Sequence, residues 1–525
     1  MGRSIYSRLN RKFGSIPSLA ERQTASQKKI DTIEDYYPFQ LTQADVFKRL
    51  LSKKSVFIVG AGFAGLTAGW WLSKHGMTVT VFEARNRIGG RVWSESLGGN
   101  SPVIERGGEL IGRNHPTWLR FAKLFGLGLS LITPDDDYIK QEAPMWVGGQ
   151  ALDSQEQEKI YREMTIAYET LNHDAAAVDA YMPWNVANAK AWDDRPVEDW
   201  IASLARCSEA TKAQLRFEIS TNQTVPVTEQ SYLGLLAAVK GGSLTDLRKP
   251  KRGPSEFWTD SEVFRCAAGN QELARQLRDG IEKSGGNVLL ECPVKEIDMC
   301  ADSITVITQD SKHQSASWVI VAVPPSLLDD LTLPVNDLNS FKIRMGPAVK
   351  YLAETKSRFW LKKGLAPSGS DDSLGMIWEG TDNQILPVAR GAELTAFAGG
   401  ALAQKALSAS NPNQYFQSGM ERLYPGFGSE LASDHFVDWP NEPWTRGGYS
   451  CPVRGQVGTA AKKLFEANGR LVWAGEHCCM AFFGYMESAL QSGLHAAQII
   501  ARAEGIPEAN KIWEERMIAS NSPGA

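Results

Sequence analysis

The chain has 525 residues, 43% hydrophobic and 22% charged, which is enough to bury a large core and favours two intertwined domains. A net charge of -4 and a pI near 6.1 give no general attraction to polyanions, so no nucleic-acid partner is expected. Seven cysteines, an odd number in a chain this long, do not form a disulfide framework and favour the reducing cytoplasm.

The N-terminal arm, residues 1–48, is polar and weakly periodic. Its basic residues Arg3, Arg8, Arg11 and Lys12 are not followed by an apolar segment and a cleavage site, so no secretory signal is predicted. We expect a solvated, poorly ordered tail, with organelle targeting as the alternative. No stretch reaches the roughly 18 uninterrupted apolar residues of a membrane helix, so no membrane span is predicted.

The first strong pattern is a strand, a helix and a second strand. The apolar, β-branched run at 55–59 predicts a buried parallel strand. A helical pattern follows at 65–75, and the run at 78–82 predicts the second strand of a βαβ unit. Residues 113–254 then become helical and rich in loops. Later strand-like runs lie at 287–290, 304–307, 318–323 and 471–474, and a last helix is predicted from 485 to about 502.

The turn after the first strand fits the dinucleotide fingerprint G-x-G-x-x-G. Gly60 permits the tight turn, Gly62 lets the backbone approach a pyrophosphate, and Gly65 lets helix and strand pack closely. Ala64 lies where the helix begins and offers free N–H groups to phosphate. Glu83 ends the second strand, where its carboxylate can accept hydrogen bonds from a ribose. The alternative is a glycine-rich turn with a surface glutamate.

Paired arginines and glycines follow directly, and they favour FAD over NAD. Ala84 and Arg85 lead into this second motif. The backbone N–H groups of Gly89 and Gly90 can approach phosphate oxygens, and Arg91 can donate a charge-assisted hydrogen bond to them. The pattern resembles the second flavin-binding motif of FAD enzymes of the glutathione reductase type, and it most resembles that of flavin monoamine oxidases.

Further stretches resemble the flavin amine oxidase family in the same order, so that the resemblance covers roughly residues 50 to 505. It implies an α/β fold, in which a Rossmann-like FAD-binding domain with a central parallel sheet joins a discontinuous α+β substrate-binding domain. The matching stretches are 104–112, 265–270, 346–350, 358–360, 475–477 and 484–489. The implied segments are the arm (1–48), three FAD-binding segments (49–112, 255–335, 440–505), two substrate-domain segments (113–254, mainly helical, and 336–439) and a C-terminal tail (506–525).

The resemblance also implies individual FAD contacts. The backbone of Val294 would contact adenine, and Glu476 would bind the ribityl chain or the pyrophosphate region. N–H groups of the helix that begins near Met486 would face the N1–C2=O edge of the flavin and stabilise the charge of its reduced form. Further cofactor contacts are implied for Gly107, Gly108, Glu109, Gly475 and Tyr485.

Three residues are implied to be catalytic. Lys350 would face the flavin and hold a water by N5 during the reaction with oxygen, and the alternative is a surface lysine on a strand. Tyr449 and Tyr485 would flank the substrate amine in an apolar slot, with Gly484 beside it, and the alternative is that the tyrosines belong to the core or the rim.

Two departures from the family pattern bear on cofactor and substrate. Gly448 stands where monoamine oxidases carry the cysteine that joins FAD, so FAD is predicted to be non-covalent; Cys451 is out of register by three residues. Near the place where many amino acid oxidases carry an arginine for the substrate carboxylate stands a leucine. Arg113 or Arg446 could supply that charge, whereas Glu109 would suit the second charge of a diamine.

The implied activity is oxidation of the carbon–nitrogen bond of a small amine or L-amino acid by hydride transfer to flavin N5. An imine and hydrogen peroxide would form, with oxygen as acceptor. One alternative is a desaturase or porphyrinogen-type oxidase, and another is a non-catalytic FAD-stabilised scaffold. No metal is predicted, because His477, Cys478 and Cys479 are consecutive and cannot easily share one ion. A homodimer is left open.

Overall fold

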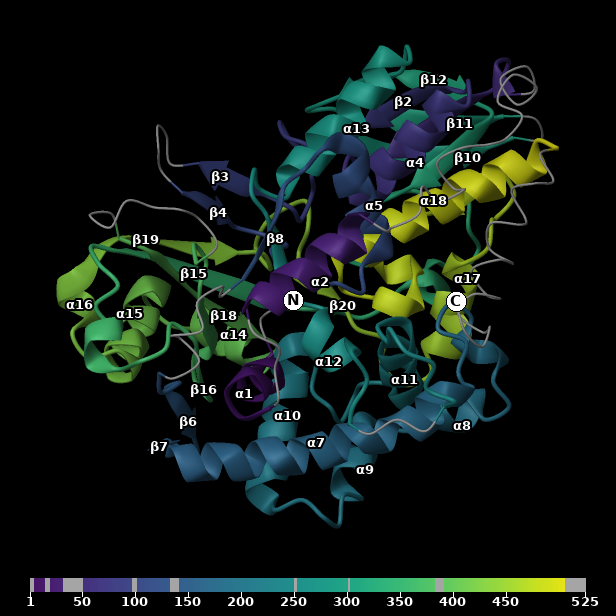
Figure 1. The fold of residues 1–525 in the computed structure, drawn as a ribbon. Coiled ribbons are helices and arrows are strands. Elements are labelled where there is room, and N and C mark those ends of the chain that lie inside the picture. Colours follow the sequence, from purple (N-terminus) through teal and green to yellow (C-terminus); the bar gives the residue numbers. More distant parts are fainter. Residues whose placement is uncertain are drawn as a thin grey trace.

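Figure 1 shows a lobe with α4, α13 and α18 at the upper right, a lobe with β15, β18 and β19 at the left, and helices α7 to α11 at the bottom. In the part of the chain that the structure describes, every helix is too short or too polar to cross a bilayer. The structure is a computed structural model that describes residues 4–14, 19–31, 51–96, 102–132, 141–249, 253–300, 303–382 and 391–505.

The upper right lobe is built on a parallel sheet that confirms the predicted fold class. In order, its strands are β21 (Leu471–Trp473), β13 (Trp318–Val321), β1 (Ser55–Val59), β2 (Thr78–Phe82) and β9 (Asn287–Leu289). Every pair of neighbours is parallel. Parallel neighbours require crossover connections, so strands from distant parts of the chain meet in this sheet. Helix α4 (Phe63–Lys74) packs against both α13 (Gln271–Lys283) and α18 (Met486–Ala503).

The turn between β1 and α4 has the geometry that its glycines require. Gly60 has φ +110°, in the left-handed region that disfavours other residues. A Cβ at Gly65 would lie 2.1 Å from the carbonyl oxygen of Gly60, so this glycine acts through close packing of helix and strand. The helix begins at Phe63, two residues earlier than predicted, because Gly62 serves as its N-cap.

A second, seven-stranded sheet forms the lobe at the left of Figure 1. Its pairs are antiparallel except β16 with β6. In order, the strands are β19 (Leu431–Asp438), β15 (Ala348–Thr355), β18 (Glu393–Gly399), β17 (Gly375–Glu379), β16 (Gly369–Asp371), β6 (Met145–Val147) and β7 (Gln150–Ala151). Helices α14 (Ala401–Leu407) and α15 (Pro412–Leu423) pack on it with α16 (Phe427–Glu430). The boundaries of the predicted segments stay predictions.

The two faces of this sheet differ in their side chains. Val349 and Tyr351 in β15 belong to the apolar core beneath α14 and α15. Since side chains alternate along a strand, Lys350 lies on the opposite face. It stands directly across from Phe397 of β18. This opposite face forms part of the candidate site.

The N-terminal arm contributes a buried helix, so the prediction of a solvated tail is wrong for residues 4–14. Helix α1 (Ile5–Phe13) is capped by Ser4, whose hydroxyl accepts a hydrogen bond from the N–H of Ser7 at 3.0 Å. Ile5 and Leu9 are each only 1% exposed, because the apolar residues of α1 form one stripe that faces the core. Residues 32–48 of the arm lie outside the described residues.

Helices and short strands complete the structure. The helices are α2 (Leu19–Asp31), α5 (Pro116–Phe125), α7 (Ser154–Ala177), α8 (Ala189–Asp194), α9 (Val197–Ala202), α10 (Glu209–Gln223), α11 (Tyr232–Gly241), α12 (Phe257–Asp260) and α17 (Lys462–Leu464). The strands are β3 (Ser94–Ser96), β4 (Val103–Glu105), β5 (Leu129–Leu131), β8 (Phe264–Cys266), β10 (Val294–Met299), β11 (Ile304–Thr308), β12 (His313–Ala316), β14 (Met345–Gly346) and β20 (Tyr449–Ser450).

Candidate active site

A cavity of about 420 Å³ lies where the parallel sheet meets the seven-stranded sheet and the start of α18. It opens at the carboxyl ends of β1 and β2, the edge at which sheets of this type bind dinucleotides. Gly65 and Arg113 are the two predicted site residues that do not line it. The predicted residues that do are Gly60, Gly62, Ala64, Glu83, Ala84, Arg85, Gly90, Arg91, Gly107, Gly108, Glu109, Val294, Lys350, Tyr449, Gly475, Glu476, Gly484, Tyr485 and Met486.

Two helices begin at this cavity, α4 at Phe63 and α18 at Met486. Neither N-cap residue, Gly62 or Tyr485, makes a side-chain capping bond. A Cβ at Gly62 would have no atom within 4 Å, so the backbone is open to a ligand at this point. Uncapped N–H groups and the positive dipole end of a helix suit phosphate and other electron-rich groups. These features fit the pyrophosphate and the flavin ring of FAD.

Glu83 and Arg85 fix the end of β2 beside the cavity. The carboxylate of Glu83 accepts hydrogen bonds from the N–H groups of Ala61, at 2.8 Å, and of Arg85, at 2.9 Å. The Arg85 guanidinium donates to Glu442 through Nε, at 3.1 Å, and to Thr445 Oγ1 at 2.7 Å. It therefore ties the end of β2 to the loop that precedes Gly448.

Glu476 joins three parts of the site. It accepts hydrogen bonds from Arg91 Nη1 at 2.7 Å, from Ser450 Oγ at 2.6 Å and from the N–H of Gly484 at 2.7 Å. Burial disfavours its charge, but the Arg91 guanidinium and these hydrogen bonds hold its pKa below the ordinary value. The same carboxylate thus orients Arg91 and the two segments that carry the predicted tyrosine pair.

Lys350 is buried, which excludes the surface-lysine alternative. Its Nζ donates to the carbonyl oxygen of Glu105 at 3.0 Å and to Glu109 Oε2 at 2.7 Å. Glu109 Oε1 accepts from Arg265 Nε at 2.9 Å and from Trp378 Nε1 at 2.8 Å. Both oxygens of Glu109 therefore have partners within the protein, and a role for Glu109 toward the second charge of a diamine stays a prediction.

The two arginines considered for a substrate carboxylate lie apart from each other. Arg113 pairs with Asp260 at 2.9 Å and does not line the cavity, so it is not part of the candidate substrate site. Arg446 lines the cavity, and its Nη1 donates to Asp330 at 3.0 Å. A carboxylate clamp from either would have to displace an existing ion pair.

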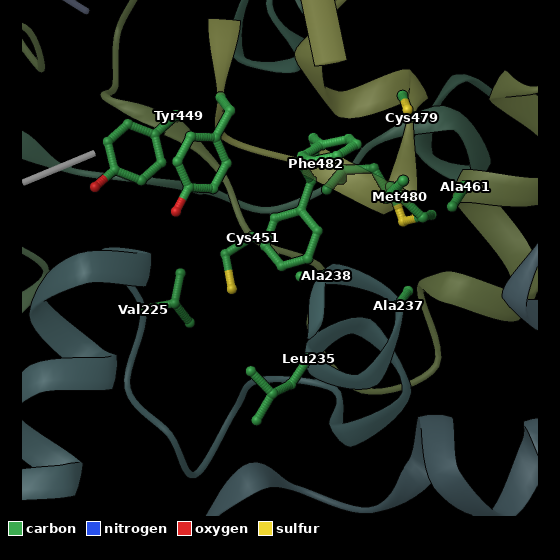
Figure 2. Packing of buried hydrophobic residues seen from close by; sticks show 14 of the residues in the cluster. Val225, Leu235, Ala237, Ala238, Tyr449, Cys451, Ala461, Cys479, Met480 and Phe482 are labelled. Carbon is green, nitrogen blue, oxygen red and sulfur yellow. The ribbon is translucent and has the colours of Figure 1, made fainter. Parts of the chain in front are cut away.

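Aromatic side chains form the apolar part of the site. The Tyr449 ring stacks on Phe397, with centroids 6.5 Å apart, and its hydroxyl donates to the carbonyl of Asn222 at 2.6 Å. The Tyr485 ring lies edge-on to His115, with centroids 5.1 Å apart. Figure 2 shows Tyr449 within the buried apolar cluster, near Cys451. Phe397 was not predicted, because only the cross-strand register with Lys350 brings it here.

A second cavity, of about 30 Å³, shares Tyr485 with the first. Its walls include Ser4 and Ser7 at the start of α1 and the buried carboxyl groups of Glu218 and Glu262. The N–H of Ser4 donates to Glu262 at 2.8 Å. The arm thus reaches the back of the candidate substrate site, for which the sequence carried no recognisable signal.

The family described as "Flavin containing amine oxidoreductase" matches residues 63–501, and the one described as "Pyridine nucleotide-disulphide oxidoreductase" matches residues 14–99. A flavin-containing amine oxidase of Danio rerio is 24% identical over 89% of this chain and 90% of its own length. The flavin-containing amine oxidase A of Sus scrofa is 26% identical over 87% of each chain.

Solved structures share the fold. A putrescine oxidase bound to putrescine is similar with a TM-score of 0.73 and 21% identity. The cyclohexylamine oxidase of Brevibacterium oxydans IH-35A is similar with a TM-score of 0.73 and 23% identity. In both comparisons the similarity covers 86% of this chain and 99% of the other.

Proposed function

This chain belongs to the family of flavin-containing amine oxidoreductases, and from that premise we propose that it is an oxidase of the carbon–nitrogen bond of a small amine. Its cofactor is FAD. Bound FAD would accept a hydride from the carbon next to nitrogen and pass the electrons to oxygen, giving an imine and hydrogen peroxide. Water would then hydrolyse the imine to a carbonyl compound and ammonia or an amine.

The ion pairs of the cavity favour an amine over an amino acid. Among the residues that the structure describes, four cationic side chains line the cavity, and each is paired with a carboxylate of the protein: Arg85 with Glu442, Arg91 with Glu476, Lys350 with Glu109 and Arg446 with Asp330. The carboxylate of an amino acid would have to compete for one of them. A monoamine requires no such exchange, and this observation carries the choice of substrate class.

The protein's part in the reaction is to position the amine. We assign Tyr449 and Tyr485 to the walls of an apolar slot, in which the aromatic faces also tolerate a partly cationic nitrogen. Burial raises the pKa of both hydroxyls well above the ordinary value, so both rings stay neutral. Lys350 would present its ammonium group to the flavin and hold a water there.

The test is anaerobic reduction of the purified holoenzyme, followed as bleaching of its flavin absorption. The panel contains benzylamine, cyclohexylamine, putrescine, L-leucine and L-lysine. We expect a monoamine to bleach the flavin and peroxide to form when air is admitted. Faster bleaching by the amino acids would move the proposal to an amino acid oxidase. If no compound reduces the flavin, the proposal fails and the desaturase alternative gains weight.

Tyr485→Ala should slow bleaching at least tenfold, because one wall of the slot is lost. Tyr485→Phe keeps the ring and is the matched control, with an expected change of a few-fold at most. Equal losses in both variants would contradict the role of the ring face.

A further inference from the structure

We propose that Glu109 is a positioning residue, which fixes the ammonium group of Lys350 at the cavity wall and thereby sets the rate at which reduced FAD reacts with oxygen. The proposal rests on the proposed function only in taking oxygen as the electron acceptor. In the step concerned, the reduced flavin anion gives two electrons and its N5 hydrogen to O₂. One further proton is taken up, and oxidised FAD and hydrogen peroxide are formed.

The contact between Glu109 and Lys350 is direct and buried. The Nζ to Oε2 distance is 2.7 Å, and the two side chains are 2% and 6% exposed. Both residues line the main cavity. An ammonium group has three donors, and the carbonyl of Glu105 takes one while Glu109 takes another. The third remains for a water or a reacting species in the cavity.

Glu109 is itself held on its other oxygen. Oε1 lies 2.9 Å from Nε and 2.8 Å from Nη2 of Arg265, so one edge of the guanidinium holds this single oxygen. Trp378 donates to the same oxygen at 2.8 Å. Arg265 also bonds to Asp382 through Nη1 and to the carbonyl of Glu379 at 3.0 Å. The ammonium of Lys350 therefore ends a chain of alternating charges.

Four separate elements build this arrangement. Lys350 comes from β15, Trp378 from β17 and Arg265 from β8, and Glu109 follows β4. Each of these contacts joins residues more than 100 positions apart in sequence, so the arrangement forms only in the folded protein. Such preorganised charges lose little energy in reorganisation when the charge of a reacting group changes.

Glu109 differs from three other buried glutamates, Glu105, Glu379 and Glu393. Burial raises the pKa of Glu105 and Glu379 to about 7 and that of Glu393 to about 8. Burial acts on Glu109 in the same direction, but Lys350 and Arg265 outweigh it and lower its pKa to about 2. Among these four carboxyl groups, Glu109 alone is ionised throughout the neutral range, and it alone contacts the lysine ammonium.

The experiment measures reoxidation separately from amine oxidation. Holoenzyme is reduced with a stoichiometric amount of dithionite in the absence of any amine and then mixed with oxygenated buffer at pH 7 in a stopped-flow instrument. The variants are Glu109→Gln, Lys350→Met and the double variant. The matched control is Glu393→Gln, which changes a buried glutamate that does not contact Lys350 and is largely protonated at this pH.

We expect reoxidation to slow at least tenfold in Glu109→Gln and in Lys350→Met, and the double variant to be no slower than Lys350→Met alone. Glu393→Gln should stay within twofold of the wild type. Glu109→Asp keeps the charge and should recover most of the lost rate, which a purely structural role would not require. It also serves as the test if Glu109→Gln fails to retain FAD.

Three results would overturn the proposal: wild-type reoxidation in Glu109→Gln, fully additive losses in the double variant, or a loss in Glu109→Asp as large as in Glu109→Gln. Because no amine takes part, a protein that oxidises no amine but shows the expected rates would refute the proposed function and leave this inference standing.

Discussion

At the scale of single residues, Gly448 bears on the prediction that FAD is bound non-covalently. Its place in the sequence predicts non-covalent FAD, and the structure adds a steric reason. A Cβ at this position would lie 2.5 Å from the Cβ of Ala348, closer than side chains approach one another. The carbonyl oxygen of Gly448 also accepts a hydrogen bond from Arg91 Nη1 at 3.1 Å. Cys451 lies nearby but does not line the cavity, and burial raises the pKa of its thiol.

We therefore expect denaturation of the holoenzyme to release all of its FAD, and Gly448→Cys to gain no covalent bond. Absorbance of the supernatant and of the precipitated protein at the flavin maximum checks this. The variant should also melt at a lower temperature, because the new side chain must push Ala348 aside. Gly428→Cys, where the nearest atom to an added Cβ is 3.4 Å away, is the control. Flavin that stays with precipitated wild-type protein would contradict the prediction.

The tyrosine pair predicts the pH dependence. Burial raises the pKa of Tyr449 and Tyr485 well above the ordinary value of 10, so neither loses its proton below pH 9. The rising limb of kcat/KM then reports deprotonation of the substrate ammonium, with about a tenfold gain per pH unit below its pKa.

Tyr449→Phe should lower kcat/KM by roughly two- to tenfold, through loss of the hydrogen bond to Asn222, and leave the limb in place. Steady-state rates between pH 6 and pH 9 check this. If the rising limb of the kcat/KM profile shifts by more than half a pH unit in this variant, the ionisation that it reports belongs to Tyr449 and not to the substrate.

At the scale of elements, the sequence of helix α1 did not indicate that the helix is buried. Tyr6 and Leu9 are buried, and the N–H of Tyr6 lies 3.3 Å from both oxygens of Glu218. Residues 4–13 contain four charged or amide side chains among ten, so the apolar stripe is masked in any average over the segment. The apolar stripe is buried because α1 packs against α7 and α12.

We expect Leu9→Ala to lower the free energy of unfolding by about 2–5 kcal/mol, as other buried Leu→Ala changes do. Leu124→Ala removes the same atoms from a residue that is 50% exposed, and it should change the free energy of unfolding by less than about 0.5 kcal/mol. Urea unfolding of both variants compares them. Equal stability of Leu9→Ala and wild type would show that α1 does not dock in solution.

At the scale of the whole molecule, we expect bound FAD to hold the two lobes together and so to stabilise the folded protein. The main cavity is lined from β1, from the face of β15 and from the start of α18, so one ligand bound in it would contact both lobes. A ligand present at 100 times its Kd stabilises the folded state by about 2.7 kcal/mol. The melting temperature of the apoprotein should therefore rise with FAD concentration. NAD should cause no such rise, and an equal effect of both nucleotides would contradict FAD selectivity.

The sequence alone determined the parallel sheet, the dinucleotide turn at Gly60–Gly65 and the family, because these features depend on residues close together in one βαβ unit and on motifs in a fixed order. Tertiary structure decided the partners of Glu109, which lie 156 and 241 positions away in the chain, and it removed Arg113 from the substrate site. It also decided that α1 is buried. The sequence specifies the chemical type of each side chain. The partners of that side chain depend on strand register and helix docking, which are determined by packing between segments far apart in the chain.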